Sequence, residues 1–281
     1  MHPVLFQIGS IVIPAYGALA AAGVLCALML ALRTARIAGI DPNKVWNLCI
    51  VVLFTALIGS RILLIIANWS LLRAHPIWMM GISMIHHPML AAAGTALALL
   101  AGGIFVRRSR MALRATADVL APPVALAFAF EQIGALLAGS GYGTGTHLRW
   151  AVTYSNPLAE RWSGAPIGIP VHPVQAYTAL AFFFITIFLL LCLPKRRQRG
   201  DIAGIFLMCA GVALFVTEFW RDPIGRGAIF GGFLKGPQVE AVALVLAGAV
   251  LLLERDSQRI AAVSSPGAGS QQQASQETMH G

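Results

Sequence analysis

The sequence predicts an all-α polytopic membrane protein, a seven-transmembrane-helix bundle with a head formed by its long outer loops. Hydrophobic residues make up 58% of the 281 residues and charged residues only 11%, whereas a soluble globular chain carries about a quarter charged residues. The mean hydropathy is +0.76. Apolar runs of ~17–25 residues are long enough to cross a bilayer. Seven such runs cover about residues 11–32, 45–67, 90–106, 119–137, 174–193, 202–219 and 239–253.

The character of these runs excludes other classes. They are continuous rather than alternating, which argues against a membrane β-barrel. No Lys or Arg precedes the first run, and Arg33 and Arg36 follow it, the reverse of a secretory signal, so a permanent first span is expected. The cysteines lie inside spans without metal-ligand spacing, and neither a metal nor a cofactor is expected. The membrane domain is expected over 1–255, and the polar residues 256–281 form a disordered cytoplasmic tail.

Basic residues indicate the orientation of the bundle. Eleven Lys and Arg residues stand in the loops after the first, third and fifth spans, against six in the other interspan loops. Because cytoplasmic loops carry the excess of Lys and Arg, the N-terminus is expected outside and the C-terminus inside. The formal net charge of +9 comes mostly from these loops. These loops are short and lie at span ends, so no nucleic acid is expected as a partner. The expected partner is the membrane bilayer.

Strongly polar side chains gather toward the outer ends of the spans. Glu131 interrupts the apolar run AFAFEQIG, Arg61 lies in GSRILL and Glu218 in VTEFWRD. A charge within a span costs at least ~2.5–3.5 kcal/mol on insertion scales, so it is normally paired and functional. Two interpretations remain. Arg61 forms an ion pair with Glu131 or Glu218 that only joins helices, or the polar groups form one outer-facing site, which their shared depth favours.

Histidines stand at the same outer side. His86 and His87 directly precede the third span, and His172 with Gln175 begins the fifth. Histidine has the unperturbed pKa best placed for proton transfer near neutrality. His87 is therefore a candidate for chemistry, with interfacial packing as the alternative.

The two long outer loops are rich in glycine. The 138–172 loop interleaves glycines with aromatic residues, and the 221–238 loop adds Arg221, Arg226 and Lys235. Glycines allow backbone N–H groups to approach an anion, and aromatic residues suit the headgroup layer. These loops point to an anionic lipid headgroup, and solvated loops without a ligand are the alternative.

Nearly the whole chain, from HPVLFQIGSIVIPAYG to KGPQVEAVALVLAG, resembles the prolipoprotein diacylglyceryl transferases of bacterial inner membranes. No single piece is diagnostic, but their order and depth together are fairly specific. The matching pieces are Ala15-Tyr16-Gly17, GSR at 59–61, His87 before an AAAG run, ADVLAPPVALA at 117–127, HPVQAY at 172–177, RG at 199–200, EFWRDP at 218–223 and GPQ at 236–238.

The resemblance implies an activity and a place for it. The family transfers a diacylglyceryl group from phosphatidylglycerol to the lipobox cysteine of prolipoproteins, so prolipoprotein signal peptides and phosphatidylglycerol are the implied partners. The outer loops would form a periplasmic head on an inner-membrane protein. The implied catalytic residues are His87, Glu218 and Tyr16; the implied substrate-binding residues are Arg61, Arg221, Gln132, Gly139, His172 and Gln175.

The chain departs from the family pattern at several positions. After the fourth span the family has Arg-(Ile/Leu)-Gly-Asn, whereas Gln132 and Ala135 occupy the first and last of these positions here. Leu214 replaces a sixth-span arginine and Pro14 a histidine before the tyrosine. Glu131 replaces a glycine, and the family assigns it no role. A catalytically silent, phospholipid-binding homologue is therefore an alternative. A transporter is less favoured, because the charges stop at one face.

Overall fold

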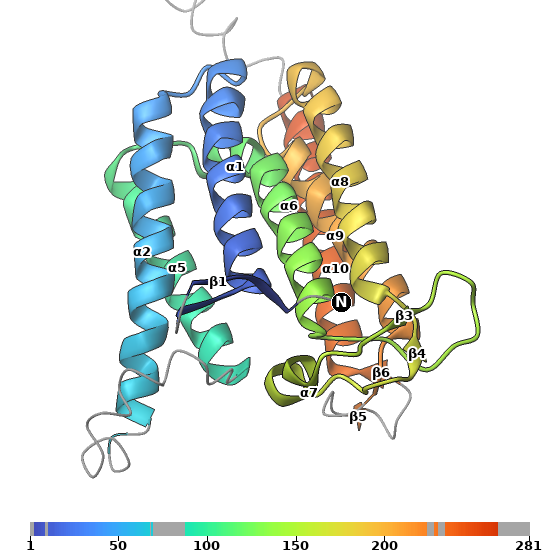
Figure 1. Ribbon diagram of the computed structural model, residues 1–281. Coiled ribbons are helices and arrows are strands. Elements are labelled where there is room, and N and C mark those ends of the chain that lie inside the picture. The colour runs from blue at the N-terminus through green and yellow to red at the C-terminus, as the bar shows by residue number, and fades with distance from the viewer. Residues whose placement is uncertain are drawn as a thin grey trace, which may run out of the picture.

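The computed structural model describes residues 3–8, 11–67, 69, 88–223, 228–229 and 234–263. Within this part, seven long helices run side by side, and successive helices alternate in direction (Figure 1). We call the end that holds residues 139–173 the loop end, and the other the opposite end. The helices are α1 (Ala15–Ile37), α2 (Pro42–Ala67), α5 (Pro88–Arg108), α6 (Leu113–Ala138), α8 (Val174–Cys192), α9 (Asp201–Thr217) and α10 (Gly236–Val263).

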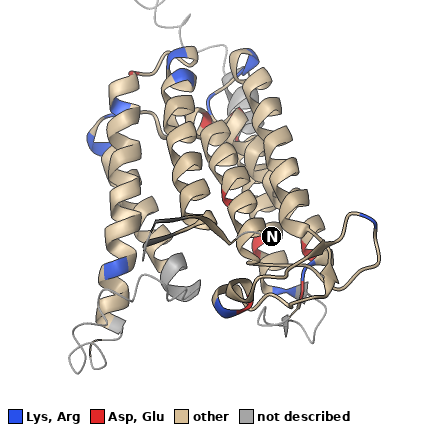
Figure 2. Cartoon of the chain, viewed as in Figure 1, with Lys and Arg blue, Asp and Glu red and all other residues tan. Residues whose placement is uncertain are grey.

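The prediction of an all-α polytopic membrane protein is confirmed. Six helices of the described part, all except α5, are long and apolar enough to cross a membrane. Helix α5 has 21 residues and packs along α2. The middle of the helices is largely free of charged residues, and the residues coloured blue and red lie mostly toward the two ends (Figure 2). Helix α10 continues to Val263, past the expected span, and residues 264–281 of the expected tail lie outside the described residues.

Short strands occupy the loop end. They form three antiparallel pairs in the described chain: β1 (Val4–Ile8) with β2 (Ile11–Pro14), β3 (Val152–Thr153) with β4 (Pro170–Val171), and β5 (Ala228–Ile229) with β6 (Leu234–Lys235). The expectation that the first span starts at residue 11 is wrong, because β-branched Ile11, Val12 and Ile13 favour a strand. Pro14 precedes the first residue of α1. The remaining elements are α7 (Pro157–Ser163) and two 3-10 turns, η2 (Leu193–Lys195) and η3 (Glu218–Trp220).

Helix α6 is the central helix of the bundle. It packs against α1, α8 and α9, and half of its most apolar stretch is buried inside the protein. Small residues let α1 approach closely, as in many membrane helix pairs. A Cβ added at Gly23 would lie 2.6 Å from Cβ of Phe130, and one at Gly134 would lie 3.2 Å from the Tyr16 backbone. This close packing fixes Tyr16 beside the loop end of α6.

A proline pair in α6 creates a bond to α1. Pro123 has no N–H, so it cannot donate to the carbonyl of Val119 one turn earlier. The hydroxyl of Thr34 donates to this carbonyl over 2.8 Å. Freed backbone groups in membrane helices are commonly satisfied by side chains of neighbouring helices. The carbonyl that Pro123 leaves free therefore accepts a bond that stabilises the contact between α1 and α6.

A buried carboxylate connects four segments at the opposite end. Asp118 of α6 is 0% exposed. The N–H groups of Gly200 and Ala203, at the start of α9, donate to it over 2.7 and 2.9 Å. Arg196 forms an ion pair with Asp118 over 3.5 Å and donates to the carbonyl of Ala38, just after α1, over 3.1 Å. An anion is favoured at a helix N-terminus, so Asp118 fixes α9 against α6.

Candidate functional site

Polar side chains from three elements form a continuous chain of contacts at the loop end. The hydroxyl of Tyr16, at the start of α1, donates to Oε1 of Glu131 in α6 over 3.1 Å. Nε2 of Gln132 donates to Oε2 of Glu131. Nη2 of Arg221, just after η3, lies 3.5 Å from the acceptor Oε1 of Gln132. This set of contacts continues through three further residues. We call all seven residues together the polar cluster: Tyr16, Glu131, Gln132, Glu218, Arg221, Lys235 and Gln238.

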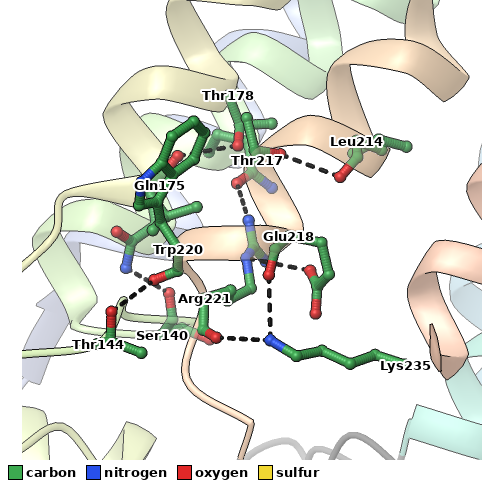
Figure 3. A network of polar contacts seen from close by, with 12 residues as sticks. Ser140, Thr144, Gln175, Thr178, Leu214, Thr217, Glu218, Trp220, Arg221 and Lys235 are labelled. Atoms are coloured by element: carbon green, nitrogen blue, oxygen red, sulfur yellow. Dashed lines mark hydrogen bonds and ion pairs between the residues drawn. The ribbon is translucent and has the colours of Figure 1, made fainter. Parts of the chain in front are cut away.

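The other half of the polar cluster is an ion pair with a lysine beside it. Nε of Arg221 lies 3.6 Å from Oε2 of Glu218, whose side chain is buried. Lys235 of β6, directly before α10, donates from Nζ to the carbonyls of Glu218 and Arg221 over 3.1 and 2.9 Å (Figure 3). Its backbone N–H donates to Oε1 of the buried Gln238 over 3.0 Å. Two carboxylates and two cations are thus held together where α1, α6, α9 and α10 reach the loop end.

A second group of contacts fixes the 139–173 loop. Gln175 is completely buried and donates to the carbonyl of Ser140 over 2.8 Å. The hydroxyl of Tyr154 donates to the carbonyl of Leu136 over 3.1 Å, and burial raises the pKa of Tyr154 to about 12. Gly139 ends α6 at φ +81°, in the left-handed region that favours glycine. These contacts hold the loop against the ends of α6 and α8.

The loop also lies against η3, beside the polar cluster. Gly143 donates to the carbonyl of His172, so closely that an added Cβ would lie 2.5 Å from that oxygen. Thr144 donates to the carbonyl of Trp220 over 2.9 Å. The backbone N–H of Asp222 donates to the carbonyl of Tyr142 over 3.2 Å. Burial, together with the negative charge of the Asp222 carboxylate, raises the pKa of the Tyr142 hydroxyl. The loop and η3 therefore form one connected surface.

An aromatic group lies next to this surface. The indole N–H of Trp150 donates to the Tyr177 hydroxyl over 2.8 Å, and Nδ1 of His172 lies 3.5 Å from the same oxygen. The rings of Tyr177 and Trp220 meet edge to face, with centroids 6.2 Å apart. Trp150 and Trp220 are exposed, as expected of aromatic residues in a headgroup layer. The aromatic group and the polar cluster share η3.

The structure brings together many of the residues expected from sequence, but in a different pairing. Tyr16, Gln132, Glu218 and Arg221 belong to the polar cluster, whereas Gly139, His172 and Gln175 hold the loop beside it. The carboxylate of Glu131 binds Tyr16 and Gln132, and the described part contains no ion pair between Glu131 and Arg61. The side chain of Arg61 is exposed on α2. His86, His87 and Arg226 lie outside the described residues.

Comparison with known proteins identifies the family and several relatives of this chain. Residues 3–254 match the family model described as prolipoprotein diacylglyceryl transferase. The chain belongs to the prolipoprotein diacylglyceryl transferase family. A phosphatidylglycerol–prolipoprotein diacylglyceryl transferase of Tolumonas auensis is 32% identical over 89% of this chain and 94% of its own length. Similar relatives with related names come from Vibrio cholerae (29% identical, 90% of this chain and 91% of the relative) and Clostridium perfringens (27%, 89% and 94%).

Two positions at which the family resemblance predicts an arginine hold Gln132 and Leu214 in this chain. Gln132 occupies one of those positions, and the guanidinium of Arg221 reaches it from η3. Lys235, one of the basic residues that the sequence places in the 221–238 loop, adds a second cation. The contact of Glu131 with Tyr16 was missed because no local pattern connects residues 115 positions apart. The sequence signals for Lys235 were its place in the basic, glycine-rich 221–238 loop and its position directly before the matching GPQ piece.

Proposed function

We propose that this protein transfers a diacylglyceryl group from phosphatidylglycerol to the lipobox cysteine of prolipoproteins. The observation that carries the proposal is the polar cluster, which gathers Tyr16, Glu218 and two cations at one end of an apolar bundle. In the reaction, the cysteine sulfur attacks the glyceryl carbon that bears the phosphate. The carbon–oxygen bond breaks, glycerol phosphate leaves with the bonding electrons, and a base accepts the thiol proton. Such a site needs cations around the phosphate, a base and room for lipid.

The orientation that we propose places the loop end in the periplasm. All seven helices, α5 included, then cross the bacterial inner membrane, with the N-terminus outside and the C-terminus in the cytoplasm. The Lys and Arg residues near the opposite end support this choice, since cytoplasmic ends carry the positive excess. The strands, α7 and the 139–173 loop would form the periplasmic head, and its exposed Trp150 and Trp220 would lie in the headgroup layer.

Cations of the polar cluster are the proposed contacts of the phosphate. Arg221 provides a guanidinium, which can bind phosphate through two parallel hydrogen bonds. Lys235 provides a point charge 2.9 Å from the Arg221 carbonyl. We assign Arg61 of α2 to the same headgroup because of its family position, and Gln132 to orienting Arg221. Lysine does not reproduce the planar guanidinium, so Arg61→Lys distinguishes a bidentate contact from a general positive charge.

His87 is the proposed base. A thiol with a pKa near 8.5 is mostly protonated at neutral pH, and a transferase gains from a neighbouring base. General base catalysis typically contributes ~10²–10⁴-fold, so His87→Gln should lower the transfer rate by at least ~10²-fold, while His86→Gln should change it little. A greater loss for His86→Gln would assign the role to the neighbouring residue, and full activity of both variants would remove histidine from the mechanism.

Reconstitution tests the proposal directly. The purified chain in nanodiscs of phosphatidylglycerol is incubated with a lipobox peptide, and the products are identified by mass spectrometry. We expect a thioether-linked diacylglyceryl peptide and an equal amount of glycerol phosphate. A lipobox peptide with serine in place of the cysteine is the matched control and should gain no lipid. If the folded protein binds phosphatidylglycerol but forms neither product, the chain is the silent, lipid-binding homologue.

A further inference from the structure

Glu131 is a carboxylate without a cationic partner in the described part of the chain. It lies half-buried in α6, and its two oxygens accept bonds from neutral donors, the Tyr16 hydroxyl over 3.1 Å and Nε2 of Gln132. None of the ion pairs between described residues includes it. A charge within a span is costly and is normally paired. The negative charge of Glu131 therefore needs an explanation beyond the packing of α1 on α6.

The bond between Glu131 and Gln132 does not follow from helix geometry. Adjacent residues of a helix point in directions about 100° apart and do not normally face each other. Here the Tyr16 hydroxyl holds Oε1 of Glu131 from α1, and the other carboxylate oxygen accepts from Gln132. A carboxylate can accept on both oxygens, and its charge makes such bonds roughly twice as strong as neutral ones. Tyr16 thus fixes Glu131, and Glu131 in turn fixes Gln132.

The carboxylate determines which way the buried Gln132 amide points. An amide has donors at its nitrogen and an acceptor at its oxygen, whereas a carboxylate only accepts and a guanidinium only donates. Gln132 stands between one of each, with Glu131 at its nitrogen and Arg221 at its oxygen. Of the two orientations that differ by a half-turn of the amide, one satisfies both neighbours and the other satisfies neither. Glu131 therefore holds the amide oxygen toward Arg221.

The amide oxygen in turn contributes to the orientation of Arg221. Nε of Arg221 lies 3.6 Å from Oε2 of Glu218 (Figure 3), and Nη2 lies 3.5 Å from Oε1 of Gln132. Contacts at two different nitrogens restrict the plane of a guanidinium, and binding phosphate through two parallel hydrogen bonds depends on that plane. Since the contact with Gln132 is long, it orients Arg221 only while Gln132 is itself held.

We propose that Glu131 is a positioning residue for the transfer reaction. It holds the Gln132 amide with its oxygen toward Arg221 and so keeps the guanidinium in the plane in which it meets the substrate phosphate. The inference rests on the proposed function, in which Arg221 contacts that phosphate. Two other roles predict different results. A base that accepts the thiol proton would need the negative charge of Glu131 itself, and a link between α1 and α6 would act independently of Gln132.

Two substitutions at Glu131 separate these roles. Glu131→Met has a similar length but no acceptor, and we expect it to lower kcat/KM for phosphatidylglycerol roughly ten- to hundredfold, since ~1 Å of misplacement can cost ~10²-fold. Glu131→Gln keeps an oxygen for Gln132 and can donate its amide N–H to the Tyr16 oxygen, so it should stay within about threefold of the wild-type value. Equal losses for both variants would assign the role to the charge and overturn positioning. Glu160→Met, at an exposed position of α7, is the matched control and should keep the wild-type rate.

A double-mutant cycle tests whether Glu131 acts through Gln132. Gln132→Met alone removes the contact with Arg221, so adding Glu131→Met in that background should lower kcat/KM by no more than about twofold, because residues that act as one unit show non-additive losses. The same loss in both backgrounds would show that Glu131 acts independently, as a link between helices would. Glu131→Ala, which leaves room for water on both donors, replaces Glu131→Met if that variant does not fold.

Binding of phosphatidylglycerol provides a readout that does not need transfer. Titration of the protein in detergent micelles with short-chain dihexanoyl phosphatidylglycerol should give a Kd about tenfold higher for Glu131→Met than for the wild type. In the Arg221→Ala background the same substitution should leave Kd unchanged. If the wild type binds the lipid without forming product and Glu131→Met still weakens binding, the proposed function fails and the positioning role stands. If the wild type transfers and Glu131→Met matches it in rate and Kd, the positioning role is overturned and the proposed function stands.

Discussion

Replacing Arg221 by alanine should lower the rate of diacylglyceryl transfer by ~10²–10³-fold, the usual effect of removing one group that stabilises developing negative charge. Arg221 is the cation that contacts both Glu218 and Gln132, so its loss removes the proposed phosphate contact. The rate is measured with phosphatidylglycerol and a lipobox peptide, at equal amounts of folded protein. Arg161→Ala removes an exposed arginine of α7 at the same end and should keep the wild-type rate.

The same substitution also leaves the buried carboxylate of Glu218 without its ion-pair partner, so stability and chemistry must be separated. Breaking a buried ion pair from one side costs about 3–5 kcal/mol, whereas removing both charges costs far less. The double variant Glu218→Gln with Arg221→Ala should therefore recover much of the lost stability but none of the lost activity. If Arg221→Ala retains activity within about threefold, which is ~0.7 kcal/mol, Arg221 does not contact the transition state.

Replacing Asp118 by alanine should have the largest effect on stability, about 3–5 kcal/mol of the free energy of unfolding. The change removes the ion pair with Arg196 and leaves two buried N–H donors, those of Gly200 and Ala203, without an acceptor. Each such orphan donor costs ~1–3 kcal/mol. Reversible unfolding in mixed detergent micelles measures the difference.

An exposed ion pair supplies the matched control for Asp118. Arg114 and Glu254 approach to 2.7 Å, closer than Asp118 and Arg196, but their side chains are 35% and 56% exposed. Exposed pairs contribute about 0–1 kcal/mol, so Glu254→Ala should cost no more than that despite the shorter distance. Equal losses for Asp118→Ala and Glu254→Ala would show that Asp118 does not hold α9 in place.

The span pattern was predictable because lipid allows backbone polar groups few alternatives to a helix. Apolar runs therefore located the long helices, and five of their seven starting positions lie within three residues of the expected ones. The strand at Ile11–Pro14 was missed because β-branched residues are equally apolar in a strand and in a span. The length of α10 was underestimated because its last turns are polar, and hydropathy alone does not report a helix that leaves the lipid.

The depth of several polar residues of the candidate site was predictable from the sequence, whereas their pairing was not. Depth along each span placed Tyr16, Glu131 and Glu218 at the same end of the bundle. Which of them touch depends on how far each helix is rotated and how closely it packs. The contact of Tyr16 with Glu131 follows from the approach permitted by Gly134. That of Arg221 with Gln132 depends on the turn η3, which no periodic pattern indicated.

The hydrogen bond between Thr34 and Val119 has a consequence for biosynthesis. Helix α1 enters the membrane long before its main partner, since roughly 100 residues separate the end of α1 from the end of α6. At ~5–20 residues per second, ribosomes need ~5–20 s for that distance. During this interval the Thr34 hydroxyl can donate within its own helix, because the carbonyls of Leu30 and Ala31 lie 3.1 Å away. The nascent first helix can thus remain in lipid with the Thr34 hydroxyl hydrogen-bonded within its own helix. The hydroxyl then donates to the carbonyl of Val119 once α6 has inserted beside α1.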